Sequence, residues 1–462
     1  MSTNSLRWAV LPAARYASLA AGERQAGHLH WARLGDSTFV WAAGDRATDE
    51  VGRLGIEPAQ AGGLALVTQV GRSLQNAHPH VRVLLDHGRH LVVDSATLPA
   101  VSTDPDCWRV EPLPADLVVV DRPAVAAERT DPAVDGLLSQ LSPSAYESDL
   151  GQLVGFGTRH SLSQGFANAA VWAAGRLGSL GYATSRQPIT VGSGHSENVV
   201  ADRTGIAEGA RGLVLVTAHL DSVNLAGGPS APAPGADDNG SGSAGLLELG
   251  RIIATRAWQR DFRLILFGGE EQGLHGSRQY VNALPAGERA RVRAVLNMDM
   301  VATRNTVQPA VLLEGAPVSS GLIDELAVAA ATYTGLRVET SLAPFASDHV
   351  PFIDAGVPAV LTIEGADSAN GAIHTDQDVL SRIDLVLMQE ILRMNLAALA
   401  GWLGSAVSSP RPAGSVVASG PGRLDVFMVG SDAAMYHKAW DGTAWLPDRT
   451  GFHRLGDTVI ST

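Results

Sequence analysis

The sequence predicts an α/β protein: a mixed, mostly parallel sheet sandwiched by helices, with a small N-terminal accessory domain and a short β segment at the C-terminus. Three observations support this prediction. The chain has 462 residues, too many for one ordinary core. Near-continuous apolar runs alternate with helical patterns over residues 131–405. Short apolar runs separated by turn residues precede and follow that region.

The composition is that of a globular protein. Apolar residues make up 45% of the chain and charged residues 18%. The 34 Lys and Arg against 47 Asp and Glu give a formal net charge of −13, which argues against nucleic acid and anionic membranes as partners. A single cysteine, Cys107, excludes an intrachain disulfide. No apolar run has membrane-spanning length, and the first residues lack the pattern of a signal peptide.

Residues 1–125 are expected to form the accessory domain, of α/β or β-rich type. The expected strands are "STFVWAAG", "GLALVTQV", "VRVLLDHGRHLVVD" and "DLVVVD". No cluster of residues with catalytic chemistry occurs there, so the role of this domain is open between covering a cleft and assisting folding. The stretch "RPAVAAERTDPAVDG", rich in Pro, Ala and charge, predicts a linker to the next domain.

Residues 131–405 show the pattern of a layered α/β domain. Helical spacing of apolar residues marks "DGLLSQLSPSAYESDLGQLVGF" and "GFANAAVWAAGRLGSLGY". Strands are then expected at "RGLVLVTAH", "FRLILFGG", "RVRAVLNMDM" and "VPAVLTIEG". Helices are expected at "SGSAGLLELGRIIATRAW", "GSRQYVNALP", "GLIDELAVAAATYTG" and "RIDLVLMQEILRMNLAALAGWL". Such strands between amphipathic helices indicate a sheet buried on both faces.

The C-terminal region is expected to contain a linker at 406–420 and a β segment at 421–462. The linker prediction follows from the Pro, Gly and Ser content. The segment "MYHKAWDGTAW" resembles one repeat of a β-propeller or lectin-like module, which would allow carbohydrate contact. One repeat cannot close a propeller, so a short β appendage is the alternative.

Residues that commonly bind metals follow the predicted strands of the central domain. They are His219 and Asp221, Asp237 and Asp238, Glu270 and Glu271, Asp299, and His374. Taken singly, each has an ordinary explanation as a structural histidine, a helix N-cap or a solvated loop. Because strand ends gather at one edge of an open α/β sheet, their joint occurrence predicts a single site.

The residue types favour a site for two metal ions. Two histidines and three carboxylates suit a pair of zinc-like ions. Such a pair needs one carboxylate between the ions and a further carboxylate as general base. The adjacent residues Glu270 and Glu271 fit this division, because neighbouring side chains at a strand end point in different directions.

Five segments in this order, "TAHLDSV", "GADDNGSG", "FGGEEQGLHGS", "NMDM" and "IHTDQD", resemble metallopeptidase family 28. The resemblance is to the co-catalytic di-zinc aminopeptidases of the bacterial leucyl aminopeptidase type, and it covers residues 131–405. It implies the zinc-exopeptidase type of fold. The segments "GTRHS" and "SENVVA" also resemble the first part of that domain.

The resemblance implies a role for each ligand-type residue. His219 and Asp299 would hold one zinc ion, Glu271 and His374 the second, and Asp238 would bridge both. Glu270 would be the general base. Asp221 would fix the ring of His219, and Asp237 would have a supporting or turn role.

The activity implied by the resemblance is removal of an apolar N-terminal residue from peptides, by water that two zinc ions and Glu270 activate. Phe345, Phe352 and Ile373 are expected to line the pocket for that residue, with ordinary core packing as the alternative. Another hydrolase on the same scaffold, a carboxypeptidase or dipeptidase, is one competing hypothesis. A catalytically dead binding protein is another, but it predicts lost ligands. The resemblance suggests secretion, although the chain shows no signal peptide.

Overall fold

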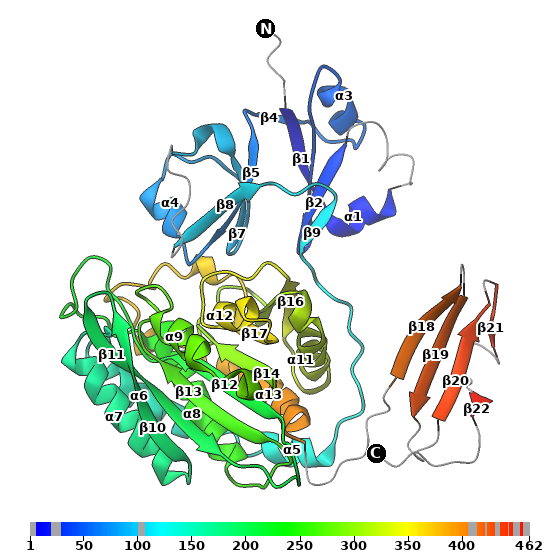
Figure 1. Ribbon diagram of the computed structural model, residues 1–462. Helices are drawn as coiled ribbons and strands as arrows, with labels where there is room; N and C mark the ends of the chain where they lie inside the picture. The colour runs from blue at the N-terminus through cyan, green and yellow to red at the C-terminus, as the bar shows by residue number, and fades with distance from the viewer. Residues whose placement is uncertain are drawn as a thin grey trace. The chain divides into compact units, whose positions relative to one another are not determined.

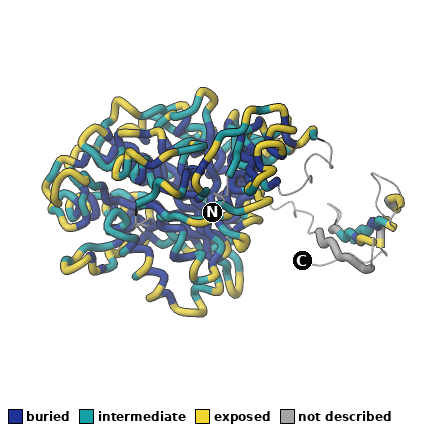
Figure 2. The backbone as a smooth tube through the Cα atoms, turned by 90° about the horizontal axis from the view of Figure 1, so that it is seen from above, coloured by how far each residue is buried: buried dark blue, intermediate teal, exposed yellow. Residues whose placement is uncertain are grey.

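The computed structural model describes residues 6–19, 29–99, 107–404, 414–420, 423–429, 435–441, 443–446 and 453–455. The chain divides into two compact units, Met1–Leu403 and Gly404–Thr462 (Figure 1). The expected accessory and α/β domains therefore belong to one unit. Within it, buried residues gather in the interior and exposed residues lie at the surface (Figure 2).

The N-terminal region contains two sheets. One has the order β4-β1-β3-β2-β9 and the other β6-β7-β5-β8. The strands are β1 (Leu6–Pro12), β2 (His30–Leu34), β3 (Ser37–Ala42), β4 (Ala59–Ala61), β5 (Leu64–Gln69), β6 (Val83–His87), β7 (His90–Asp94), β8 (Trp108–Pro112) and β9 (Leu117–Val120). The short helices are α1 (Ala13–Ser18), α3 (Ala47–Gly52) and α4 (Ser73–Ala77). The segment "VRVLLDHGRHLVVD", expected as one strand, is instead a hairpin. It turns at Gly88, whose φ of 64° suits glycine.

The central sheet has eight strands in the order β10-β11-β13-β12-β14-β17-β15-β16. They are β10 (Ala183–Val191), β11 (Gly194–Arg203), β12 (Leu213–His219), β13 (Asp261–Phe267), β14 (Val292–Met298), β15 (Ala310–Glu314), β16 (Arg337–Ser341) and β17 (Ala359–Glu364). The pairs β12–β13, β12–β14, β14–β17 and β15–β16 are parallel, and the other three are antiparallel. The predicted fold class is confirmed.

Helices pack on both faces of this sheet. They are α5 (Pro132–Leu138), α6 (Pro143–Val154), α7 (Gln164–Ser179), α8 (Gly242–Ile253), α9 (His275–Ala283), α10 (Ala286–Arg289), α11 (Ser320–Tyr333), α12 (His349–Asp354) and α13 (Leu385–Leu403). One core contains residues of α5, α6, α7, α8, α11 and α13. A second, smaller core contains residues of α9 and α12.

Strand β12 shows why the apolar runs are continuous. Its side chains alternate: Val214 and Val216 enter the larger core, whereas Leu213 and Leu215 enter the smaller one. Both sets are buried, so polar residues have no face to occupy. The run ends at His219, at the edge of the sheet.

The C-terminal unit is an antiparallel sheet of β18 (Gly414–Gly420), β19 (Arg423–Val429), β20 (Met435–Trp440), β21 (Trp445–Leu446) and β22 (His453–Arg454). The linker expected at 406–420 is corrected in part, because residues 414–420 pair with β19 as a strand. Its first part, 406–413, lies outside the described residues. The propeller or lectin-like repeat and its carbohydrate contact stay predictions.

None of the helices described in either unit combines the length and the apolarity needed to cross a membrane.

Candidate metal centre

The candidate ligands lie at one edge of the central sheet. His219 is the last residue of β12, Glu270 and Glu271 follow β13, and Asp299 follows β14. These three strands are parallel neighbours, so their carboxyl ends lie side by side.

Two further candidate ligands lie on irregular backbone. Asp238 lies in the turn η2 (Ala236–Ser241) that leads into α8. His374 lies in the loop between β17 and α13 and has a positive φ of 58°. A non-glycine residue in this region is uncommon and occurs mostly where the surroundings hold it. The fold therefore brings all five predicted ligands and Glu270 together.

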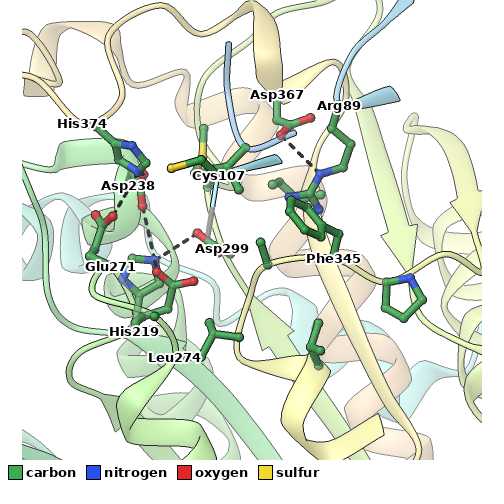
Figure 3. Close-up of a pocket in the computed structure, with 18 of the residues that line it drawn as sticks. Arg89, Cys107, His219, Asp238, Glu271, Leu274, Asp299, Phe345, Asp367 and His374 are labelled. Atoms are coloured by element: carbon green, nitrogen blue, oxygen red, sulfur yellow. Dashed lines mark hydrogen bonds and ion pairs between the residues drawn. The ribbon is translucent and has the colours of Figure 1, made fainter. Parts of the chain in front are cut away.

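Asp238 lies between the two imidazoles (Figure 3). Its Oδ1 is 3.3 Å from Nε2 of His219, and its Oδ2 is 3.1 Å from Nε2 of His374. One carboxylate thus presents one oxygen to each histidine, which is the arrangement required to bridge two ions.

Each histidine faces a second carboxylate. Nε2 of His219 is 3.2 Å from Oδ1 of Asp299, and Nε2 of His374 is 3.0 Å from Oε2 of Glu271. Glu270 lies beside the first pair, with its Oε2 4.0 Å from His219 Nε2. Among the residues that the structure describes, two groups have donor atoms close enough to hold an ion: His219, Asp238 and Glu271, and His219, Glu270 and Asp299.

The electrostatics of the site favour positive charge. Burial alone lowers the pKa of His219, but the charges of Glu270 and Asp299 raise it well above its ordinary value. The pKa of His374 is raised in the same way, chiefly by Glu271 against the effect of burial. The carboxylates thus attract protons in the place where a metal cation would bind.

The two glutamates are also perturbed. Burial raises the pKa of Glu270 well above its ordinary value, and the charges of Asp299 and Asp348 add to this against the opposing charge of His219. Burial and the charge of Asp238 raise the pKa of Glu271 to about 7. A carboxyl whose pKa approaches neutrality suits general acid–base chemistry.

Asp221 supports two parts of the site. Its Oδ1 is 3.6 Å from Nδ1 of His219, and its backbone oxygen is 3.2 Å from the same nitrogen. Its carboxylate also accepts hydrogen bonds from the backbone N–H groups of Glu270 (3.3 Å) and Glu271 (3.2 Å). The sequence predicted the contact with His219 but not the bonds to the glutamates.

The turn that carries Asp238 is held by a residue that the sequence analysis did not single out. The carboxylate of Asp378 accepts from the backbone N–H groups of Asp237 (3.0 Å) and Asp238 (2.9 Å). The side chain of Asp237 accepts from the N–H of Ala302 (3.1 Å) and from Asn370 (2.9 Å), in line with a supporting role. The signal for Asp378 was present, since it ends the segment "IHTDQD".

Two more supporting residues were missed. The hydroxyl of Ser347 donates to Oδ2 of Asp299 at 2.7 Å and so orients that carboxylate. Arg159 is fully buried and donates to the carbonyl oxygens of Leu220 and Gly235, which joins the loops after His219 and before Asp238. Arg159 lies in the quoted segment "GTRHS", whereas Ser347 has no signal in the sequence.

A cavity of about 300 Å³ opens beside the candidate ligands. Phe345 lines it, as expected. Phe352 does not: it is fully buried in the smaller core, against Phe267 and Tyr280. Ile373 is not among the lining residues; it is partly buried and packs against the hydrophobic core that the N-terminal region shares with the central sheet. The pocket role expected for Phe352 is therefore corrected, because its side chain points into a core, and the role expected for Ile373 stays a prediction.

The donor set fits zinc-like ions. It consists of two imidazoles and several carboxylates, which the fold holds close together. Among the described residues, Oε1 of Glu271 is buried without a hydrogen-bond partner, which is costly unless a cation compensates it. Fold and site together define an α/β protein with a candidate zinc centre at the edge of its central sheet.

Comparison with known proteins agrees with this class. Residues 198–399 match the model of Peptidase family M28. Leupeptin-inactivating enzyme 1 of Streptomyces exfoliatus is 29% identical over 288 residues, 61% of this chain and 58% of that protein. Aminopeptidase YwaD of Bacillus subtilis is 33% identical over 181 residues, 38% of each chain. The chain thus spans between about two fifths and three fifths of these relatives. Together the matches support an M28 metallopeptidase domain.

Solved structures share the fold. A zinc aminopeptidase from Bacillus subtilis aligns with a TM-score of 0.51 at 18% identity, over 58% of this chain and 97% of that one. LapB from Legionella pneumophila aligns with a TM-score of 0.55 at 19% identity, over 74% and 99%.

Proposed function

We propose that this protein is a zinc-dependent aminopeptidase that hydrolyses the bond after an apolar N-terminal residue of peptides. The observation that carries the proposal is the carboxylate of Asp238 between His219 and His374, with Glu270 beside the same centre. The matches to Peptidase family M28 and to relatives named aminopeptidases support the proposal.

Five residues would hold two zinc ions. His219 and Asp299 would hold one, His374 and Glu271 the other, and Asp238 would contact both. Zinc in such a site supplies Lewis acidity, which polarises a carbonyl group and makes water more acidic.

Glu270 is the residue that moves the proton. Its carboxylate lies at the centre without a place among the five ligands, and its side chain is only 11% exposed. It takes a proton from the attacking water and passes it to the nitrogen of the leaving amine. Burial raises the pKa of Glu270, and the positive charge of bound zinc would oppose this rise, so that the carboxylate could first take the proton and then release it.

Asp221 is a positioning residue in this scheme. It orients the ring of His219 and fixes the backbone that carries Glu270 and Glu271. One carboxylate therefore positions His219 for one ion, Glu271 for the other, and the general base Glu270.

The cavity next to the centre would receive the first side chain of the substrate. Its lining is predominantly apolar and includes Leu274, Met300 and Phe345. The free amine of the substrate would lie beside the metal centre, at the end of the cavity that the candidate ligands line.

Metal analysis and kinetics on aminoacyl p-nitroanilides test the proposal. Wild-type protein should bind two zinc ions per chain and release p-nitroaniline from the leucyl substrate. Blocking the substrate amine by acetylation should abolish cleavage. Failure to bind any metal after zinc is supplied would contradict the proposal and favour a binding protein.

Peptide substrates separate the competing classes of hydrolase. A dipeptidase would cleave leucyl dipeptides but not longer peptides, and a carboxypeptidase would accept peptides with a blocked amine. We further propose secretion, which detection of the protein in culture supernatant would test.

A further inference from the structure

The wall of the cavity is shared by two regions of the chain. Val70, Arg89, Cys107 and Arg109 come from the N-terminal region, whereas the other lining residues belong to the α/β region. Figure 3 draws Arg89 and Cys107 among the lining side chains, together with Asp238, His374 and Phe345. The cavity therefore needs the N-terminal region to be complete.

Val70 and Cys107 form one continuous piece of this wall. Val70 directly follows β5, and Cys107 directly precedes the paired strand β8. The backbone N–H of Val70 donates to the carbonyl oxygen of Cys107 at 2.9 Å. Because adjacent strands hold both residues, their side chains are placed by the sheet rather than by a loose loop.

A buried ion pair fixes the sheet against the cavity. Nη1 of Arg89 is 3.1 Å from Oε1 of Glu314, the last residue of β15, and both side chains are almost fully buried. The same Oε1 accepts the backbone N–H of Phe345 at 2.9 Å. Arg89 thus links the N-terminal region to the backbone of a residue that lines the cavity.

Arg109 makes a second link to the same loop. Its Nη1 donates to the carbonyl oxygen of Pro344 at 3.2 Å, and its guanidinium lies 5.1 Å from the ring centre of Phe345. Its Nε also pairs with Oε2 of Glu111 at 3.2 Å, away from the cavity lining. Because the guanidinium itself lies on the cavity wall, it disfavours a positively charged side chain next to it.

The two regions also share a hydrophobic core. Phe39, Leu66 and Val92 of the N-terminal region pack in one cluster with Leu312 and Ile363 of the central sheet. A backbone bridge joins Asp121 to Thr340, with two hydrogen bonds of 2.9 Å. Packing of this kind is typical of a permanent interface rather than of a lid that swings away.

We propose that the N-terminal region is a specificity-determining part of the substrate pocket. Val70 and Cys107 limit the length of the first side chain, and Arg109 excludes lysine and arginine there. The pocket accordingly selects uncharged side chains of intermediate size, such as leucine. This inference rests on the proposed aminopeptidase function and names its substrate class.

The test is a size series of aminoacyl p-nitroanilides with full-length variants. Cys107→Trp and Val70→Trp should reduce kcat/KM for the leucyl and phenylalanyl substrates at least 10-fold relative to the alanyl substrate, through KM. One methylene in an apolar pocket is worth 10–200-fold in discrimination. Zinc content should stay unchanged, and kcat/KM for the alanyl substrate of the same variant is the reference for the loss.

Two variants serve as matched controls. Cys107→Ser keeps the volume of the side chain and should keep the wild-type order of substrates. Leu117→Trp adds the same bulk to the same region, on a residue that is 52% exposed and outside the cavity. If Cys107→Trp and Val70→Trp give the same leucyl-to-alanyl ratio as Leu117→Trp, the proposal is overturned.

Charge selection is tested separately with Arg109→Gln. This variant should raise kcat/KM for the lysyl substrate about 10-fold relative to the leucyl one. No change in that ratio would overturn the role assigned to Arg109.

Measurements of inhibitor binding distinguish a failure of this inference from a failure of the proposed function. If wild-type protein cleaves none of the substrates, the aminopeptidase function fails. Titration calorimetry of zinc-loaded protein with leucine and alanine hydroxamates then tests, without turnover, whether the N-terminal region limits the size of the bound side chain. If Cys107→Trp binds the leucine compound more weakly than wild type and Leu117→Trp does not, the pocket role of the N-terminal region is supported. Equal binding to all variants would refute that role.

Discussion

Arg89 and Glu314 form an ion pair of 3.1 Å across the boundary between the N-terminal region and the central sheet, and both side chains are buried. Burial of an ion pair is costly, and removal of one partner leaves the other charge uncompensated. The charge of Arg89 is also the main influence that lowers the pKa of Glu314 to about 2, against the opposing effect of burial.

Arg89→Met should therefore lower the free energy of unfolding by about 3–5 kcal/mol, measured by urea denaturation. Arg186→Met is the matched control, because Arg186 pairs with Glu197 on the surface with a side chain 47% exposed. It should cost no more than about 1 kcal/mol. Equal losses in the two variants would contradict the role of burial.

Glu270→Gln and Glu271→Gln make the same chemical change at neighbouring positions. Glu270→Gln should lower kcat by about 10²–10⁴-fold with both zinc ions retained, because a general base is lost. Glu271→Gln should lose one ion as well as activity. Kinetics and zinc content of both variants check this, and loss of metal in Glu270→Gln would show that Glu270 is a ligand.

Asp221→Asn should lower zinc affinity or kcat about 10–100-fold, the usual effect of losing a partner that orients a ligand. The amide keeps an oxygen for one backbone N–H but cannot serve both Glu270 and Glu271 as the carboxylate does. Competition with a zinc chelator gives the affinity. Wild-type affinity and wild-type kcat together would exclude the positioning role.

Phe352→Ala should destabilise the fold by about 3–5 kcal/mol, because a fully buried aromatic side chain is removed. The KM of the folded variant for leucyl substrates should stay at the wild-type value. Phe345→Ala should instead raise that KM, since Phe345 lines the cavity. Thermal unfolding and kinetics of both variants separate the two roles, and a raised KM in Phe352→Ala would contradict the corrected placement.

In the zinc-free protein, the free energy of unfolding should fall as the pH rises from about 4 to about 7. Burial raises the pKa of Glu271 to about 7 and that of Asp237 to about 6. In this pH range the folded metal-free protein thus binds more protons than the unfolded chain, and its stability is greatest at the acidic end. Differential scanning fluorimetry with a chelator at several pH values measures the trend.

Zinc-loaded protein is the control for this prediction. Because zinc competes with protons for the same side chains, its stabilising effect should grow as the pH rises. A melting temperature of the metal-free protein that rises between pH 5 and pH 7 would contradict the expected loss of stability.

Strands β12, β13, β14 and β17 of the central sheet were predictable because each carries a local signal. The apolar run that ends at His219 and the run before Glu270 are each bounded by turn residues. Strands β10, β11, β15 and β16 were missed. β15 and β16 have only five residues each, and β10 is an edge strand with mostly exposed side chains.

What the sequence could not give is the direction of single side chains and the contacts between distant regions. Phe345 and Phe352 are equally apolar and close in sequence, but only the second lies in a helix that packs on the sheet. Arg89 lies in a stretch that shows only strand character, and its partner Glu314 is 225 residues away. Long-range docking of this kind depends on the completed surfaces of both regions.

The shared core of the two regions has a consequence for biosynthesis. Residues 6–121 leave the ribosome first, but the side chains of Leu361 and Ile363 that cover their apolar surface follow about 240 residues later. At ordinary translation rates of about 5–20 residues per second, that surface stays uncovered for roughly 12–50 s. The nascent chain should therefore be a chaperone client during this interval.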